Sequence, residues 1–215
     1  MNFAGVKAIT IPEGDVRSIA IGGMTVWQKP NPLPYDALVE YVESDGRNWV
    51  ETDYVPTAGA FAIDMTALAP WRDGYMMYFG AYISNSNRLY ATNQSGGTTN
   101  IAWQYGTARP GTTAFPTVTR ARTNYTFSGN THPFFVFYMS NCPSPFFPAN
   151  ARFRSAQFRD SQGALALDLV PVRVGTAGYL YDRANPTGGP LGNGLYGSAT
   201  STPLVAGPDK NGGAA

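Results

Sequence analysis

Leucines occupy every second position over residues 165–170, where they alternate with smaller or polar side chains. This period of two is typical of a strand with one buried face. A preceding strand is predicted over residues 151–159, and the residues between the two strands, Asp160-Ser161-Gln162-Gly163, are typical of a tight turn. The pattern therefore predicts a β-hairpin in the second half of the chain.

An uninterrupted apolar run, FFVFYM, covers residues 134–139. A short apolar run between turn residues favours a strand that is covered on both faces. Together with the hairpin, this run supplies the side chains that we expect in the core. They are Phe135, Phe137, Leu165, Leu167 and Leu169.

Turn residues recur roughly every 8–12 residues along the rest of the main region, as they do in sandwiches and barrels. No stretch keeps the 3.6-residue period of an amphipathic helix. Further strands are predicted over residues 38–42, 49–52, 61–68, 75–82, 88–91, 101–105, 118–127 and 178–182. The predicted fold class is therefore all-β, with two antiparallel sheets packed as a sandwich.

The N-terminal region has a small pattern of its own. Its predicted strands cover residues 8–11, 16–21 and 24–27. So short a module cannot bury a core by itself, and we expect it to pack against another part of the chain or another protein. The predicted organisation is an N-terminal β module at residues 1–29, a Pro-rich linker at 30–34, a main domain at 35–197 and a flexible, Gly-rich tail at 198–215.

Charged residues make up 13% of the chain, and the formal net charge is +1. Such a weak and balanced charge argues against a nucleic-acid-binding surface. No apolar run reaches the length of about 18 residues that suggests a membrane-spanning helix, so we expect no membrane insertion. The first residues lack the basic and apolar segments of a signal peptide. A single cysteine, Cys142, excludes an intrachain disulfide.

Residues 41–56, with the sequence YVESDGRNWVETDYVP, resemble the opening of concanavalin A-like (laminin-G-like) jelly-roll domains. Such domains occur in bacteriophage structural proteins and in surface proteins of gut bacteria. Residues 167–173 (LDLVPVR) and 178–182 (GYLYD) resemble the closing stretch of these domains, and the N-terminal module is similar to short β leaders upstream of them in phage proteins. The chain departs from the family pattern at Asp53, where Gly is usual, and in a Gly-rich insert at residues 188–194.

The resemblance implies a jelly roll in the main domain and a non-enzymatic role in a phage particle. There the chain would be a head fibre, tail fibre or decoration subunit on the virion surface, with a lectin-like face for a host glycan. The N-terminal module would attach it to other virion proteins, and it would assemble as a homo-oligomer such as a trimer. Two alternatives remain: a bacterial surface or secreted carbohydrate-binding module, and a laminarinase-like glycoside hydrolase.

The sequence predicts no catalytic residues. Hydrolases of this fold carry carboxylates at an E-x-D-x-x-E spacing, which does not occur here. Glu51 and Asp53 have the i, i+2 spacing that places two side chains on one face of a strand, and we expect them to be structural. His132, the single histidine, is the one base available to activate Cys142. We expect both to be ordinary loop or strand-end residues.

Aromatic side chains next to polar ones are the candidates for ligand binding, because a ring can stack on a sugar while Asn and Arg form hydrogen bonds. Packing in the core or in a subunit interface is the competing interpretation for each aromatic residue. The candidates are Trp71, Arg88, Tyr90, Asn93, Trp103 and Tyr105. No cofactor is expected, and no Cys and His set for zinc is present. Asp182, Asn185 and Asn193 offer oxygen ligands for Ca²⁺, but their spacing is not specific.

Overall fold

The structure is a computed structural model, and it describes residues 18–21, 24–28, 33–68, 75–84, 87–93, 100–106, 108–141 and 146–210. The chain divides into two compact units, Met1–Leu33 and Pro34–Ala215, so the boundary falls within the Pro-rich segment. In the first unit, β1 (Ser18–Ile21) pairs with β2 (Met24–Gln28) in antiparallel orientation. The strand predicted over residues 8–11 lies outside the described residues.

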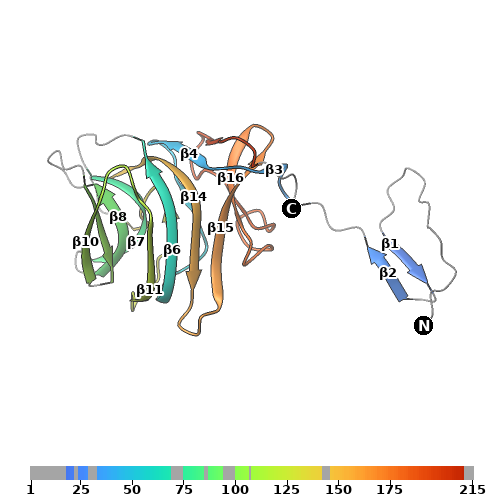
Figure 1. The fold of residues 1–215 in the computed structure, drawn as a ribbon, viewed down its shortest axis with the longest axis horizontal. Coiled ribbons are helices and arrows are strands. Elements are labelled where there is room, and N and C mark those ends of the chain that lie inside the picture. Colours follow the sequence, from blue (N-terminus) through green and yellow to red (C-terminus); the bar gives the residue numbers. More distant parts are fainter. Residues whose placement is uncertain are drawn as a thin grey trace. The chain divides into compact units, whose positions relative to one another are not determined.

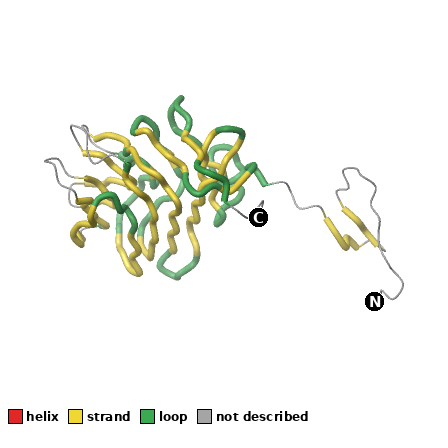
Figure 2. The backbone as a smooth tube through the Cα atoms, turned by 45° about the horizontal axis from the view of Figure 1, so that its top comes forward, coloured by secondary structure: helices red, strands yellow, loops and turns green. Residues whose placement is uncertain are grey.

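The described residues of the second unit form strands, turns and loops, and no helix occurs among them (Figure 2). The strands make two sheets (Figure 1). The seven-stranded sheet has the order β10 (Ala108–Ala114), β9 (Asn100–Tyr105), β8 (Asn87–Asn93), β7 (Tyr75–Ser84), β12 (Phe135–Val136), β5 (Val50–Glu51), and β13 (Phe146–Pro148) also pairs with β7. The nine-stranded sheet has the order β11 (Arg120–Thr126), β6 (Ala58–Ala67), β14 (Asn150–Arg159), β4 (Val42–Asp45), β18 (Leu204–Ala206), β16 (Ala177–Asp182), β15 (Leu165–Val174), β3 (Ala37–Leu38), and β17 (Leu195–Tyr196) pairs with β16.

Among these strands, β13 and β7 run parallel, and every other pair of strands is antiparallel. The predicted all-β class with two antiparallel sheets is confirmed. The predicted hairpin is also present, as β14 and β15. In its turn, Oδ1 of Asp160 accepts hydrogen bonds from the backbone N–H groups of Gln162 and Ala164 over 2.9 Å each, and Gly163 has a φ of 85°.

Part of the nine-stranded sheet closes into a barrel of five strands, because β14, β4, β18, β16 and β15 form a ring. The strands β14 and β15 pair next to their turn, where Ala156 lies opposite Leu169, and they separate toward their other ends. There Asn150 pairs with β4 and Val174 with β16. In a ring of five strands, up and down strand directions cannot alternate all the way around, although each neighbouring pair here is antiparallel. The strands must therefore turn relative to one another, as strongly twisted strands do.

The core lies between the two sheets. Phe61 and Phe158 come from the nine-stranded sheet, and they meet Tyr105 and Phe134 from the other side. The ring centroids are 5.9 Å apart for Phe61 and Tyr105, and 4.9 Å apart for Phe134 and Phe158. All four side chains are buried. Removing these large apolar rings from water is the main force that holds the two sheets together.

Two predicted features differ from the structure in the apolar segments. The run at residues 134–139 contains only the two-residue strand β12, because Phe137 has a φ of 66° and cannot continue a strand. Its side chains are still largely buried, but Phe135 is only half-buried. In the hairpin, Leu167 and Leu169 are buried as predicted, whereas Leu165 is 37% exposed because it lies next to the turn at the end of the sheet.

The prediction of a flexible tail from residue 198 was wrong for residues 198–210. Strand β18 inserts between β4 and β16 and completes the barrel. Beyond it, Nε and Nη2 of Arg173 donate hydrogen bonds to the two carboxylate oxygens of Asp209, over 3.1 and 2.9 Å. Residues 198–210 are mostly small or polar, so the sequence did not indicate a strand there. A strand of three residues can pair with its neighbours without a long apolar pattern.

Candidate ligand-binding site

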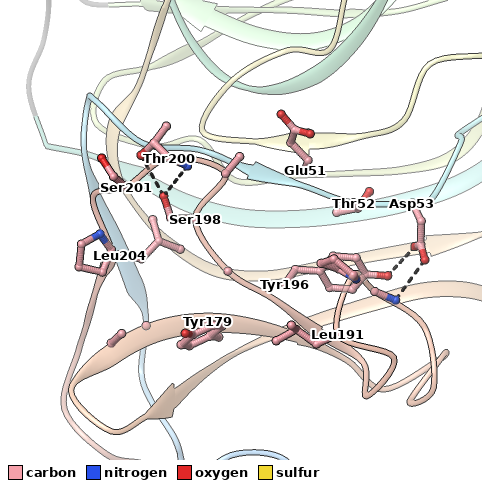
Figure 3. A pocket seen from close by; sticks show the side chains of 17 residues that line it. Glu51, Thr52, Asp53, Tyr179, Leu191, Tyr196, Ser198, Thr200, Ser201 and Leu204 are labelled. Atoms are coloured by element: carbon pink, nitrogen blue, oxygen red, sulfur yellow. Dashed lines mark hydrogen bonds between the residues drawn. The ribbon is translucent and has the colours of Figure 1, made fainter.

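A pocket of about 820 Å³ lies where three segments of the second unit meet (Figure 3). They are residues 51–53 at the end of β5, residues 177–179 in β16, and a third segment between residues 189 and 204, in which the lining comes from residues 189–191, 196–201, 203 and 204. Small-ligand sites typically have volumes of about 300–1,000 Å³. The pocket therefore has the size of a binding site, and it is assembled from segments far apart in the sequence.

Asp53 lines this pocket and accepts hydrogen bonds from two other lining residues, which come from a distant part of the sequence. The Tyr196 hydroxyl donates a hydrogen bond to its Oδ1, and the backbone N–H of Gly189 donates one to its Oδ2 over 3.1 Å (Figure 3). Tyr196 is buried, and its burial together with the neighbouring Asp53 raises the pKa of its hydroxyl. The hydroxyl therefore stays protonated at neutral pH and remains a donor.

The Gly-rich loop, residues 188–194, forms its own compact turns. The backbone N–H of Gly192 donates to the carbonyl oxygen of Gly189 over 3.0 Å, and that of Gly194 donates to the carbonyl oxygen of Gly188 over 2.8 Å. Gly194 has a φ of 76°, and a Cβ there would lie 2.8 Å from the Tyr181 ring. A side chain would therefore be both strained and crowded at this position, which explains the glycine.

Asp182 holds the start of the segment that leads into this loop. It is buried at the end of β16, and its Oδ1 accepts the backbone N–H groups of Asp168 and Ala184 over 2.9 Å each. Burial raises the pKa of the Asp182 carboxyl, and these backbone hydrogen bonds oppose that shift. Asp182 and Asp53 thus fasten the segment at two points.

Glu51 stands at the rim of the pocket, two residues before Asp53. The indole N–H of Trp49 donates a hydrogen bond to Oε1 of Glu51 over 3.0 Å. Trp49 is itself held in place, since its ring lies 5.4 Å from that of Tyr138 and its carbonyl oxygen accepts the N–H of Ala199 over 2.8 Å. The Glu51 carboxylate is exposed to solvent in this setting, and it is available to a ligand.

Tyr179 supplies an aromatic surface to the pocket. The ring is half-buried and packs over Gly197, where an added Cβ would lie 2.8 Å from the ring atom Cε1. Hydroxyl groups follow along the adjacent loop, where the side chains of Ser198 and Thr200 hydrogen-bond to each other over 3.1 Å (Figure 3). Leu191, on the Gly-rich loop, is 62% exposed at the edge of the pocket.

The chemistry of the lining is polar with one aromatic surface. Two of the described residues that line the pocket, Glu51 and Asp53, carry carboxylates, and none of the lining residues is basic. Hydroxyl and carboxylate oxygens accept hydrogen bonds from hydroxyl groups of a ligand. The aromatic surface of Tyr179 suits the apolar face of a ring. This combination fits a polyhydroxylated ligand without negative charge.

The predicted binding residues lie elsewhere. Trp71 is outside the described residues, and the five others are brought together on the adjacent strands β8 and β9. Four of these five are buried, and none of the five lines the pocket. Those four are Tyr90, Asn93, Trp103 and Tyr105.

Each of these residues has structural contacts. Asn93 accepts the N–H of Met76 over 3.0 Å, and the Trp103 indole donates to Thr113 over 3.0 Å. Arg88 is half-buried; its Nε donates to Gln104 over 3.0 Å and its guanidinium lies 4.6 Å from the centre of the Tyr90 ring. Both faces of β8 and β9 are covered, so the alternative interpretation of these aromatic residues, core packing, describes them.

The remaining candidates for chemistry do not form a site in the described part of the chain. His132 is half-buried in a loop, where its backbone N–H donates to the Asn130 side chain over 3.0 Å. Cys142 lies outside the described residues. No group of three or more potential metal-ligating side chains occurs among the residues that the structure describes. Within that part of the chain, no helix has the length and apolar character needed to cross a membrane.

A second cavity, of about 610 Å³, lies on the face of the nine-stranded sheet that points away from the core. Two of its charged side chains bond to each other. Arg183 pairs with Asp168 over 2.9 Å, and Gln157 donates to the same carboxylate over 3.0 Å. The Asp168 carboxylate is therefore occupied by partners within the chain.

Comparisons of the chain with protein-family models, with curated proteins and with solved structures found no match. The residues that line the pocket were only partly indicated by the sequence. The i, i+2 spacing of Glu51 and Asp53 indicated that their side chains share one face of a strand, and the Gly-rich insert indicated the loop. Tyr179 and the hydroxyls of residues 198–201 gave no sequence signal, because their proximity depends on the closure of the barrel.

Proposed function

We propose that the second unit is a non-enzymatic glycan-binding module, and that a glycan without acidic groups occupies the pocket between Glu51, Tyr179 and the loop at residues 198–201. The observation that carries this proposal is the lining itself: one accessible aromatic surface surrounded by hydroxyls and the Glu51 carboxylate, with no basic residue among the described lining. A sugar ring has an apolar face for Tyr179 and hydroxyl donors for the oxygen atoms.

A role in hydrolysis has less support from the same residues. Glycoside hydrolysis uses two carboxyl groups, one as acid and one as base or nucleophile. In this pocket both oxygens of Asp53 accept hydrogen bonds from within the chain. Glu51 alone then remains for a ligand, which suits recognition rather than bond cleavage.

The resemblance of residues 41–56, 167–173 and 178–182 to concanavalin A-like domains extends the proposal. The second unit would be a jelly roll of that kind, exposed on the surface of a phage particle and directed at a host glycan. The first unit would attach the chain to other virion proteins, and the chain would form a homo-oligomer, with a trimer as the specific form. The mass of the full chain in solution tests the oligomer, and a monomer at micromolar concentration would argue against it.

Binding of the full chain to a panel of immobilised glycans tests the central proposal. We expect neutral oligosaccharides to bind better than oligosaccharides of uronic acids, and high salt to reduce that difference because it screens the carboxylates. Tyr179→Ala should weaken binding by about tenfold, since an aromatic contact contributes on the order of 1 kcal/mol in addition to the buried area.

Two control variants make this result specific. Tyr179→Phe keeps the ring and should retain most of the affinity. Phe147→Ala removes a ring that is 42% exposed on β13, outside the pocket lining, and should change nothing. Failure of the wild-type chain to bind any glycan of the panel, or equal binding by Tyr179→Ala, would refute the proposed function.

A further inference from the structure

We propose that Asp53 is a positioning residue, whose carboxylate fastens the Gly-rich loop in the place where it forms a wall of the pocket. Glycan affinity would then depend on Asp53 through the loop and not through direct contact. The consequence for ligands rests on the proposed function. The fastening itself can be measured with no ligand present.

The geometry of the Asp53 carboxylate supports this assignment. Its two oxygens reach two different partners, the backbone N–H of Gly189 in the loop and the hydroxyl of Tyr196 in β17. One side chain thus connects the end of β5 to both the loop and the strand that follows it. Tyr196 is buried and pairs through its backbone with Leu180 of β16, so it offers a rigid point of attachment.

The loop needs such an attachment because of its composition. Glycine loses more conformational freedom on ordering than any other residue, so a loop with four glycines in residues 188–194 is costly to hold in one shape. The hydrogen bonds within the loop connect residues that are close in sequence. The hydrogen bond from the Asp182 N–H to the Gly194 carbonyl oxygen, 2.9 Å long, holds only the C-terminal end of the loop. The carboxylate of Asp53 connects Gly189, within the loop, to the segment that follows β5.

Glu51 provides the matched control. It lies two residues earlier on the same wall and carries the same charged group, but its carboxylate accepts the Trp49 indole N–H and makes no described bond to the Gly-rich loop. A change at Glu51 should therefore affect a ligand directly and leave the loop in place. A change at Asp53 should release the loop.

Amide hydrogen exchange of the full chain tests the fastening. In Asp53→Ala we expect the Gly189 amide to exchange about ten- to hundredfold faster than in the wild type, the range that corresponds to the loss of one charge-assisted hydrogen bond. Asp53→Asn, which keeps one acceptor oxygen, should show a smaller increase. Glu51→Ala should leave the exchange of residues 188–194 unchanged, and amides of the β14–β15 hairpin should keep their protection in all three variants.

Glycan affinity then tests the consequence. Asp53→Ala should weaken binding together with the increase in loop exchange, whereas Glu51→Ala should weaken binding without it. Unchanged exchange at Gly189 in Asp53→Ala would overturn the inference, and so would an equal increase throughout the hairpin, which would indicate a general loss of stability. A released loop with unchanged affinity would overturn its role as a pocket wall. If the wild type binds no glycan, the proposed function fails, and the exchange data alone decide the role of Asp53.

Discussion

Truncation of Phe158 to alanine should destabilise the second unit by about 4 kcal/mol, which is typical of a fully buried Phe that leaves a cavity. Phe158 is 0% exposed. Its ring centroid lies 4.9 Å from that of Phe134, 5.2 Å from that of Tyr54 and 5.8 Å from that of Phe61. The alanine variant therefore loses contacts to both sheets at once, and the neighbouring rings cannot collapse into the space without moving a strand.

Urea denaturation, followed by circular dichroism, measures this effect. With a slope of about 2 kcal/mol per M, a loss of about 4 kcal/mol lowers the midpoint by about 2 M. Phe158→Leu keeps most of the volume and should cost about 1.5 kcal/mol at most. Phe147→Ala, at a ring that is 42% exposed, should shift the midpoint little. If Phe158→Ala lowered the midpoint no more than Phe147→Ala does, the location of the core would be wrong.

The same urea assay tests Gly80→Ala, which should lower the free energy of unfolding by at least about 2 kcal/mol. Gly80 has a φ of 146°, and a Cβ there would lie 2.0 Å from the Leu89 carbonyl oxygen. An unchanged midpoint would contradict this prediction. Burial raises the pKa of the Asp182 carboxyl, so its contribution to stability should grow as pH falls from neutral toward the ordinary Asp range, and Asp182→Asn should remove that dependence. Arg173 lowers the pKa of the Asp209 carboxyl, so this pair should stabilise the fold above the ordinary Asp range and lose its effect as pH falls below it. A stability profile between pH 3 and 7 that is the same in Arg173→Gln as in the wild type would exclude that contribution.

Local patterns in the sequence predicted the elements whose structure depends on neighbouring residues. The β14–β15 hairpin is the best example, because its alternation and its turn residues both lie within one short stretch. The apolar run at residues 134–139 shows the limit of such reasoning. Burial was predicted correctly for most of it, but the positive φ of Phe137 is stabilised by surrounding elements, including the bond of its N–H to the Tyr78 oxygen over 2.7 Å.

Exposure was the property that the sequence could not predict for the aromatic candidates. Trp103 and Tyr105 alternate with other residues as a half-exposed strand would, yet they face the main core, and Tyr90 joins a smaller cluster with Met77 and Met139. Both faces of these strands are covered. Which face is covered depends on the segments that pack against it, and these come from distant parts of the chain.

The sequence by itself determined that the main region is all-β and where most of its strands lie. Only the tertiary structure decided where a ligand could bind. Asp53 and the Gly-rich insert lie far apart in the sequence and are joined by a hydrogen bond in the pocket. Strand β18 completes the barrel that brings the pocket segments together. Periodicity reports only which face of a strand is buried, whereas pairing between distant strands depends on the free energy of the whole core.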